Sequence, residues 1–507
     1  MPARSALLLA ALSLVACSAA EIPAPERAVA LAPAPALAPA PAVAPAPAAA
    51  TTTPTASASA APAAPVDPTP NKLQIAAQVD SQAYETVRSL VDEVGPRLAG
   101  SAGDKAAVAW ALQKMKEKGL ENVRAEKVMV PHWVRGAESG RIVAPHEHTL
   151  AVTALGGSVA TPAKGLEGEV VMVDSLDALA ALDEAKVKGK FVFFSTTTAR
   201  TNDGSGYGKV AGIRYRGAIA AGKKGAIGMI LRSIGTDHDR LPHTGSMAYD
   251  KDVPKIPSAA VSVPDAELIE RLVRQGKPVR LSLSLASKTL PDAESANVIG
   301  EVKGREKPDE IVLIGAHLDS WDLGRGAIDD GAGCAAVMEA GRIVLAQEAR
   351  PRRTIRVVLF ANEENGLRGA VAYAKDHAAE LDKHQLALEV DLGSGRVHTA
   401  RFLVADGARP AAQRMAGLLK TLQINYDAGP AHGGADLIPL HAAGVPIADL
   451  HQDATKYFDV HHTANDTFDK VNEDDLNQVV AAVTTIAWAA AEAPETFARL
   501  PEELRKR

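Results

Sequence analysis

The stretch from Ile311 to Gly333 constrains the fold of this chain more than any other segment. It opens with a short apolar run, which predicts a buried β-strand. His317 and Asp319 follow at the carboxyl end of this strand, two positions apart, so their side chains point the same way on an extended chain. After a glycine-rich loop come the adjacent acids Asp329 and Asp330 and an apolar helical pattern. A histidine and several carboxylates at the end of a central strand are the groups that a hard or borderline metal ion needs.

Three later segments carry further acids and histidines that suit a metal site. A second apolar strand leads directly into the pair Glu363–Glu364, and a third short run ends at Asp391. His461 and His462 follow near the carboxyl terminus. Because each group follows a strand-like run, we expect them to converge on one edge of a sheet. Sites of this kind hold two metal ions roughly 3.5–4 Å apart and activate a bridging water for hydrolysis.

Alternating strands and helices predict the fold class. From about residue 296 the chain repeats strand, helix and strand, which predicts an α/β fold with a mainly parallel central sheet flanked by helices. A strand is also expected over 122–130. Helices are predicted over 73–93, 104–118, 335–347, 367–378 and 474–491.

The region between residues 131 and 289 is richer in strand-like runs and interrupts this pattern. One helix is expected around 218–224, before the last of these runs. Its histidines lack acids at metal-ligand spacing, so they are predicted to be surface or hydrogen-bonded residues, with His243 the candidate to face a cleft. They are His146, His148, His238 and His243.

Four motifs together carry a family resemblance. They are GPRLAGS (95–101), PHW (131–133), PHTG (242–245) and the stretch 311–333. These motifs resemble the co-catalytic di-zinc exopeptidases, and among them the plasma glutamate carboxypeptidase group, over about residues 76–492.

A second resemblance concerns the inserted region. The patterns at 189–192 and 218–228 resemble a protease-associated domain, a usually non-catalytic insertion that caps or restricts a peptidase cleft. The two resemblances imply a peptidase domain formed by 73–130 and 290–507, interrupted by a protease-associated domain at 131–289.

The exopeptidase resemblance implies which residues would bind each of two zinc ions. His317 and Asp391 would hold one ion, Glu364 and His462 the other, and Asp329 would bridge them. Imidazole and carboxylate ligands without thiolate leave positions open for water and substrate, as catalytic zinc sites require. His462 is preferred to His461 because it stands four residues before Asp466.

The same resemblance assigns further roles. Glu363 would be the general base, because neighbours on an extended segment point opposite ways and one can reach the water while the other binds metal. Asp319 would fix the tautomer of the ligand His317. His461 is expected to pack behind the site or to contact substrate, and the role of Asp436 stays open. Asp330 takes no role from the resemblance and is expected to be a surface or salt-bridged acid that caps the helix that follows it.

The predicted activity is hydrolysis of short peptides by a metal-dependent exopeptidase. Carboxypeptidase or dipeptidase action follows from the resemblance, and aminopeptidase action is the alternative. A binding protein on an inactive peptidase scaffold would have lost ligands or the base, and none is lost here. The resemblance also implies a homodimer.

The amino terminus predicts a bacterial lipoprotein. Residues 1–17 form a signal peptide too short to span a bilayer, and Leu14–Cys17 resembles a lipobox, with an ordinary signal peptide as the alternative. Lipidation at Cys17 would anchor the protein in the cell envelope, and Ser18 favours the outer membrane, facing the periplasm or the exterior. The Ala/Pro-rich segment 18–72 is predicted to be a disordered tether.

Charge argues against a polyanionic partner. The net charge is −6 and is spread along the chain, so no nucleic-acid partner is predicted. The basic group within 350–356 is predicted to be a solvated turn before a strand.

Overall fold

The computed structural model describes residues 69–506. The predicted signal peptide, its lipidation site Cys17 and the tether as far as residue 68 lie outside the described residues. Helix α1 (Thr69–Val79) already includes the last four residues of the predicted tether, 69–72. Pro70 is tolerated there because the first turn of a helix does not use its missing N–H, and Leu73 is fully buried.

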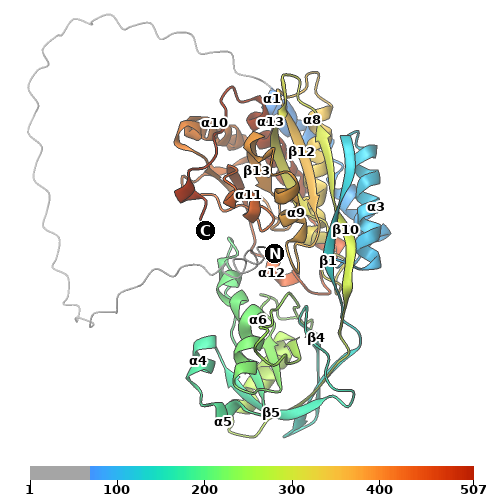
Figure 1. The fold of residues 1–507 in the computed structure, drawn as a ribbon, viewed down its shortest axis with the longest axis vertical. Helices are drawn as coiled ribbons and strands as arrows, with labels where there is room; N and C mark the ends of the chain where they lie inside the picture. Colours follow the sequence, from blue (N-terminus) through green and yellow to red (C-terminus); the bar gives the residue numbers. More distant parts are fainter. Residues whose placement is uncertain (1–68, 507) are drawn as a thin grey trace, which may run out of the picture. The chain divides into compact units, whose positions relative to one another are not determined.

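An eight-stranded sheet carries the segments predicted to hold metal (Figure 1). Its four central strands β12, β11, β13 and β16 are parallel, and antiparallel pairings extend the sheet on both sides, which confirms the α/β prediction. The strand order is β1 (Glu121–Val134), β10 (Lys288–Val302), β12 (Arg353–Phe360), β11 (Lys307–His317), β13 (His384–Glu389), β16 (Ile447–Gln452), β14 (Val397–Leu403) and β15 (Asn425–Tyr426).

Strand β11 shows why helices cover both faces of this sheet. Successive side chains of a strand point to opposite faces, so Val312 and Ile314 pack in one apolar cluster and Leu313 in another. The first cluster includes residues of α1, α2 (Ala83–Glu93), α3 (Ala102–Glu117), α8 (Ala332–Leu345), α10 (Arg409–Leu418) and α13 (Glu473–Glu492). The second includes residues of α9 (Arg368–Asp376) and α11 (Ile438–Ala442).

The single helix predicted over 73–93 is wrong, because the chain breaks between α1 and α2. The Ser81 hydroxyl accepts a hydrogen bond from the Ala83 N–H at 3.2 Å, which starts a new helix. The Gln82 N–H donates instead to the Glu339 carboxylate on α8 at 2.9 Å. Apolar spacing alone cannot reveal such a break, because the spacing continues through it.

A second eight-stranded sheet lies within residues 138–285. Its strands β5 to β8 are parallel, and helices α4 (Leu176–Ala181), α5 (Glu184–Val187), α6 (Ser205–Lys223) and α7 (Val263–Arg274) connect or follow them. The predicted helix at 218–224 is therefore only the end of α6. The strand order is β3 (His148–Leu150), β2 (Glu138–Ala144), β9 (Arg280–Leu285), β5 (Leu166–Val173), β6 (Phe191–Phe194), β7 (Gly228–Arg232), β8 (Ser258–Val261) and β4 (Val152–Ala154).

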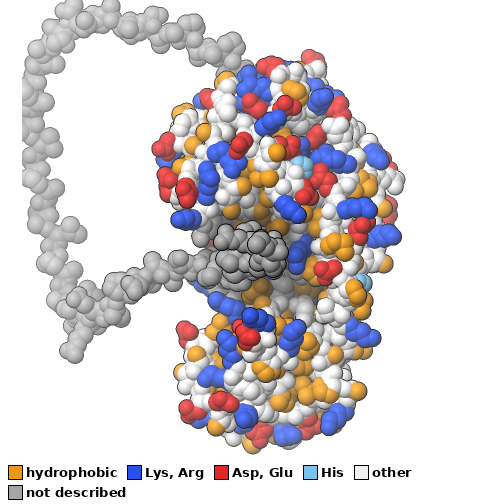
Figure 2. Space-filling view, in the orientation of Figure 1, with side chains coloured by type: hydrophobic (Ala, Val, Ile, Leu, Met, Phe, Trp, Pro, Cys, Tyr) orange, Lys and Arg blue, Asp and Glu red, His pale blue; other side chains and the backbone are white. Residues whose placement is uncertain are grey.

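The surface of the described part shows no dominant charge. Acidic and basic side chains are intermingled over the face that Figure 2 shows, as the spread of charge along the sequence predicts. Within residues 69–506, no helix is both long and apolar enough to span a bilayer.

Candidate metal centre

The parallel strands bring the first group of predicted ligands together. Strand β11 ends at His317, and Asp391 stands two residues after its neighbour β13. The His317 Nε2 atom lies 3.3 Å from Asp391 Oδ1 and 3.2 Å from Asp329 Oδ1. These three side chains can therefore face a single cation.

A second group shares Asp329 with the first. The His462 Nε2 atom lies 2.9 Å from Glu364 Oε2 and 3.3 Å from Asp329 Oδ2. In each group the ligand atoms lie within 4.8 Å of one another, so the two oxygens of Asp329 face different groups. This is the arrangement that a carboxylate bridging two metal ions requires.

The electrostatics of the site fit two cations. Burial raises the pKa of Glu364 to about 7, with the nearby Asp329 adding to the effect. Burial also raises the pKa of Asp391 and of Glu363, and it outweighs the opposing effect of His317 on both. Asp329 Oδ2 and Glu364 Oε1 are buried without a hydrogen-bond partner among the described residues. Buried carboxylates are costly unless paired, and divalent cations at the two groups would supply that pairing.

Glu363 and Glu364 do not lie on an extended segment, as the sequence analysis expected. Strand β12 ends at Phe360, and Asn362 takes a left-handed φ of 64° that starts a turn. The Leu367 N–H closes this turn on the Asn362 carbonyl at 2.7 Å. Glu364 lies beside His462, with 2.9 Å between its Oε2 atom and His462 Nε2, and Glu363 is near enough to His317 and Asp391 for their charges to influence its pKa.

Asp319 acts differently from the prediction. The Nδ1 atom of His317 hydrogen-bonds to the backbone carbonyl of Asp319 at 3.0 Å, whereas its distance from the Asp319 carboxylate is 3.8 Å. This carbonyl can only accept, so it fixes the His317 proton on Nδ1 and leaves Nε2 free to bind metal. The Asp319 carboxylate accepts from the Glu363 N–H at 3.0 Å. Asp319 therefore positions both the ligand and the predicted base.

Two further acids accept backbone hydrogen bonds around Asp329 and stabilise its loop. The Asp466 carboxylate accepts from the N–H groups of Ile328 and Asp329 at 2.7 and 3.2 Å. The Asp330 carboxylate accepts from the Gly333 N–H at 3.0 Å, within the first turn of α8. The hydrogen bond expected of Asp330 at the start of this helix is present, but its side chain is fully buried and is not the surface acid that was expected. Asp466 had served only to set the spacing of His462.

The segment 138–285 supports the ligand His462 through the backbone. His462 has a φ of 59°, a left-handed conformation that is uncommon for residues with a side chain. Its carbonyl accepts from the Thr244 N–H, in the PHTG turn, at 3.0 Å. This hydrogen bond helps to hold His462 in an unfavourable conformation.

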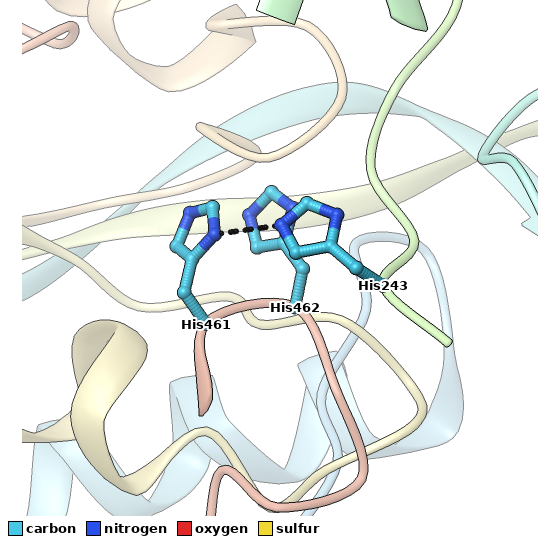
Figure 3. Close-up of side chains that lie close together, drawn as sticks. All are labelled: His243, His461 and His462. Atoms are coloured by element: carbon cyan, nitrogen blue, oxygen red, sulfur yellow. Dashed lines mark hydrogen bonds between the residues drawn. The ribbon is translucent and has the colours of Figure 1, made fainter. Parts of the chain in front are cut away.

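The predicted ligand His462 belongs to a cluster of three histidines, with His243 and His461 (Figure 3). His243 Nε2 lies 3.1 Å from His461 Nδ1, and the rings of His461 and His462 stack with centroids 3.5 Å apart at 17°. A metal ion lies in the plane of an imidazole that binds it, at about 2.0–2.1 Å from the nitrogen. Two planes inclined by 17° at this spacing meet only about 12 Å away, so one ion cannot bind both stacked rings.

The hydrogen bond between His243 and His461 instead sets a tautomer. His461 Nε2 faces Asp329 Oδ2 at 3.5 Å, and His243 Nδ1 is buried without a partner among the described residues. If His243 Nε2 donates, only an acceptor is left unsatisfied, and His461 directs an N–H towards the carboxylate. The opposite arrangement buries an unpaired N–H, which is rarer in proteins. His461 therefore presents a donor to the metal centre.

The structure brings together all five ligands proposed from the resemblance and places Glu363 and Asp319 beside them. Asp436 is also fully buried near Glu363: its N–H donates to Glu389 at 3.1 Å, and neither of its carboxylate oxygens has a hydrogen-bond partner among the described residues. Its role stays open. Sequence reasoning missed the contribution of Thr244, although the PHTG motif was a signal for it.

Several known proteins that are similar to this chain are peptidases. Residues 297–487 match the model of peptidase family M28. The chain is 36% identical to carboxypeptidase Q of Mus musculus over 427 residues, 84% of this chain and 89% of that protein. It is 48% identical to a peptidase M28 precursor from Shewanella amazonensis of known structure, with a TM-score of 0.84, covering 85% of this chain and 98% of that one.

A third comparison concerns the fold alone. The chain is 22% identical to BSAP, a zinc aminopeptidase from Bacillus subtilis, with a TM-score of 0.59 and coverage of 83% of this chain and 98% of that one. The matches to the family model, to carboxypeptidase Q and to the Shewanella protein confirm the exopeptidase resemblance, and the chain is a metallo-exopeptidase that belongs to peptidase family M28.

Proposed function

We propose that this protein is a di-zinc carboxypeptidase or dipeptidase that acts on short peptides. One observation carries the proposal: two groups of three ligand atoms share Asp329, and Glu363 lies beside them. His317 and Asp391 would hold one zinc ion, and Glu364 and His462 the other. The similarity to carboxypeptidase Q supports this choice over aminopeptidase action, the alternative.

The chain's own residues supply the proton transfers. Zinc ions bound at the two groups would provide Lewis acidity and lower the pKa of water. Glu363 then takes the proton of the attacking water and passes it to the nitrogen of the leaving amine, as a general base and then a general acid. Asp319 holds Glu363 in place through its backbone N–H.

The remaining expectations extend this proposal to the whole chain. We propose that residues 131–289 form a protease-associated domain within a peptidase domain of 73–130 and 290–507. We further propose that Cys17 is lipidated, which places the enzyme in the cell envelope, and that the enzyme forms a homodimer.

Replacement of the base tests the mechanism. We expect Glu363→Gln to lower kcat by about 10²–10⁴-fold, because the amide cannot accept the proton of water. Zinc content should not change, since Glu363 is not one of the proposed ligands. Dipeptide hydrolysis and elemental analysis of the same sample measure both quantities, and a variant with full activity would refute this role.

Blocked dipeptides test the direction of cleavage. Cleavage that survives amino-blocking but not carboxyl-blocking establishes a carboxypeptidase, and the reverse pattern an aminopeptidase. Loss with either block establishes a dipeptidase. Absence of cleavage across a broad peptide panel, with two zinc ions bound, would contradict the proposal.

A further inference from the structure

Arg214 of helix α6 reaches the metal centre from outside the ligand set. Its Nη1 atom lies 3.5 Å from Nδ1 of His462. Its Nε donates to the Ser246 carbonyl at 3.2 Å, and Nη1 also donates to the Tyr207 hydroxyl. Gly245 leaves the room that this arrangement needs, because a Cβ there would come within 2.3 Å of Nη1. The guanidinium is thus held in a fixed plane beside a proposed ligand.

The charge of Arg214 has no acidic partner in the described structure. The residue is only 9% exposed, yet no carboxylate oxygen of residues 69–506 lies within the 4.0 Å of an ion pair. By contrast, the buried Arg135, Arg353 and Arg356 each lie within 2.8 Å of a carboxylate oxygen. Arg97 also lacks an acid, but it donates to four backbone carbonyls. A buried cation that no carboxylate neutralises is costly unless an anion joins it.

Metal binding at His462 makes an anionic partner for Arg214 still more favourable. A guanidinium only donates hydrogen bonds, so its contact with His462 requires a lone pair on Nδ1. A neutral imidazole that gives the Nε2 lone pair to a metal carries its proton on Nδ1. Two donors would then face each other, and Arg214 would lose an acceptor.

We propose that Arg214 binds the α-carboxylate of the residue that follows the scissile bond. An arginine fork matches a carboxylate in charge and in geometry. Its Nη1 atom lies 3.5 Å from Nδ1 of His462, the ring whose Nε2 faces Asp329 and Glu364. Successive Cα atoms of a peptide are only 3.80 Å apart. A carboxylate one residue beyond the reacting carbonyl suits this short reach. The inference rests on the proposed function and narrows it to release of a single carboxyl-terminal residue.

The test compares two amino-blocked dipeptides that differ only at the carboxyl terminus, a free acid and its carboxamide. We expect the zinc-loaded, full-length protein to prefer the acid. We expect Arg214→Met to lower kcat/KM for the acid by about 10- to 100-fold, the effect of removing a hydrogen bond to a charged group. Its kcat/KM for the carboxamide should fall much less, because the amide offers the guanidinium no charged partner. Arg214→Lys should recover part of the activity on the acid.

Arg216→Met is the matched control. Arg216 lies two residues further along the same helix and is exposed, so its replacement should change neither substrate. Zinc content and melting temperature of each variant show whether the site and fold are intact.

A binding measurement separates this inference from catalysis. Calorimetric titration of the zinc-loaded protein with a free amino acid and with its amide should show a preference for the acid, and Arg214→Met should abolish it. Equal losses on both substrates would make Arg214 a support for His462 and overturn the inference. Equal cleavage of acid and carboxamide by the parent protein would overturn it while leaving the peptidase function intact. A zinc-loaded parent that cleaves neither substrate, yet binds the free acid through Arg214, would refute the proposed function alone.

Discussion

Arg97 packs against the loop that joins His317 to Asp329. Its side chain is fully buried, and its guanidinium donates to the carbonyls of Leu318, Arg325 and Gly326 at 2.5, 2.9 and 2.8 Å. One side chain therefore satisfies three backbone acceptors of a loop that has no regular partner strand. The position of Asp329 depends on this loop, so Arg97 acts on the metal centre without touching a metal.

We expect Arg97→Met to lower the free energy of unfolding by about 3 kcal/mol or more, because each buried acceptor left without a donor costs about 1–3 kcal/mol. We also expect zinc affinity to fall by about 10- to 100-fold, as for other residues that support metal ligands. Urea unfolding and competition with a chromophoric chelator measure the two effects. Arg88→Met is the control, since Arg88 is exposed on α2. A variant within 0.5 kcal/mol of the parent protein would contradict the prediction.

At the residue scale, the sequence predicts the metal ligands better than it predicts the residues that contact them. His317, Glu364 and Asp391 follow apolar strands whose carboxyl ends meet at one edge of the sheet, and parallel pairing confirms that arrangement. Arg214 and Thr244 reach the site only through tertiary contacts with His462, more than 200 residues away along the chain. No local pattern encodes such contacts, so sequence reasoning did not find them.

The sequence of strand β12 does not reveal that its charged side chains are buried. Its first residues belong to the basic group predicted to be a solvated turn, yet Arg353 and Arg356 are buried. The Arg356 guanidinium donates to Glu301 at 2.8 Å and to Glu380 at 2.6 Å. The prediction is wrong for these residues because acids on neighbouring elements neutralise charges that look solvated in sequence.

His377, at the end of α9, joins the same network. Its Nε2 lies 2.8 Å from Glu126 on β1, and its Nδ1 hydrogen-bonds to Glu380. Burial lowers the pKa of His377, but its hydrogen bonds to the two glutamates outweigh this effect, so the pKa is raised above the ordinary value of 6.5. The imidazolium form therefore ties α9 to the edge strand of the sheet.

We expect this histidine to make stability depend on pH. A raised pKa in the folded state stabilises the protein fully below about pH 6.5, and this contribution is lost as pH rises through the folded-state pKa. The difference in unfolding free energy between the parent protein and His377→Gln should thus be largest below pH 6 and shrink at higher pH. Urea unfolding from pH 5 to 9 measures it, with the exposed His238→Gln as control. If the difference in unfolding free energy grows with pH instead, the pKa of His377 is lowered by folding and the prediction is wrong.

At the scale of helices and strands, the apolar periodicity of the sequence predicts whether most elements are helices or strands, but not where each one ends. Helices α3, α8 and α13 lie close to their predicted ranges because each carries a long apolar pattern. The break between α1 and α2 and the turn at Glu363 depend on single polar side chains and on one left-handed residue. Such features leave the apolar period unchanged, so the period cannot locate them.

For the whole molecule, metal binding and folding should be coupled. The ligands come from strands at the centre of the sheet and from the loop after α12 (Tyr457–Val460), so unfolding separates them. A ligand that binds only the folded state stabilises it by about 2.7 kcal/mol per site when its free concentration is 100 times Kd. We expect chelation to lower the melting temperature and zinc to restore it. An unchanged melting temperature after complete zinc removal would contradict this coupling.

The predicted lipid anchor has a separate test in the intact cell. We expect Cys17→Ala to move the protein from the membrane fraction to the soluble fraction, because the attached lipid would be lost. Cys334→Ala is the matched control, since Cys334 is buried and is the other cysteine of the chain. Equal membrane association of both variants would refute lipidation at Cys17.

The hydrogen bond from Thr244 to His462 bears on how enzymes of this kind can be engineered. A deletion or graft that treats residues 138–285 as an exchangeable module also removes the donor that holds His462 in its left-handed conformation. Exchange of this segment between relatives should therefore alter zinc retention along with substrate choice, unless the receiving chain keeps the PHTG turn. The module and the metal centre have to be redesigned together.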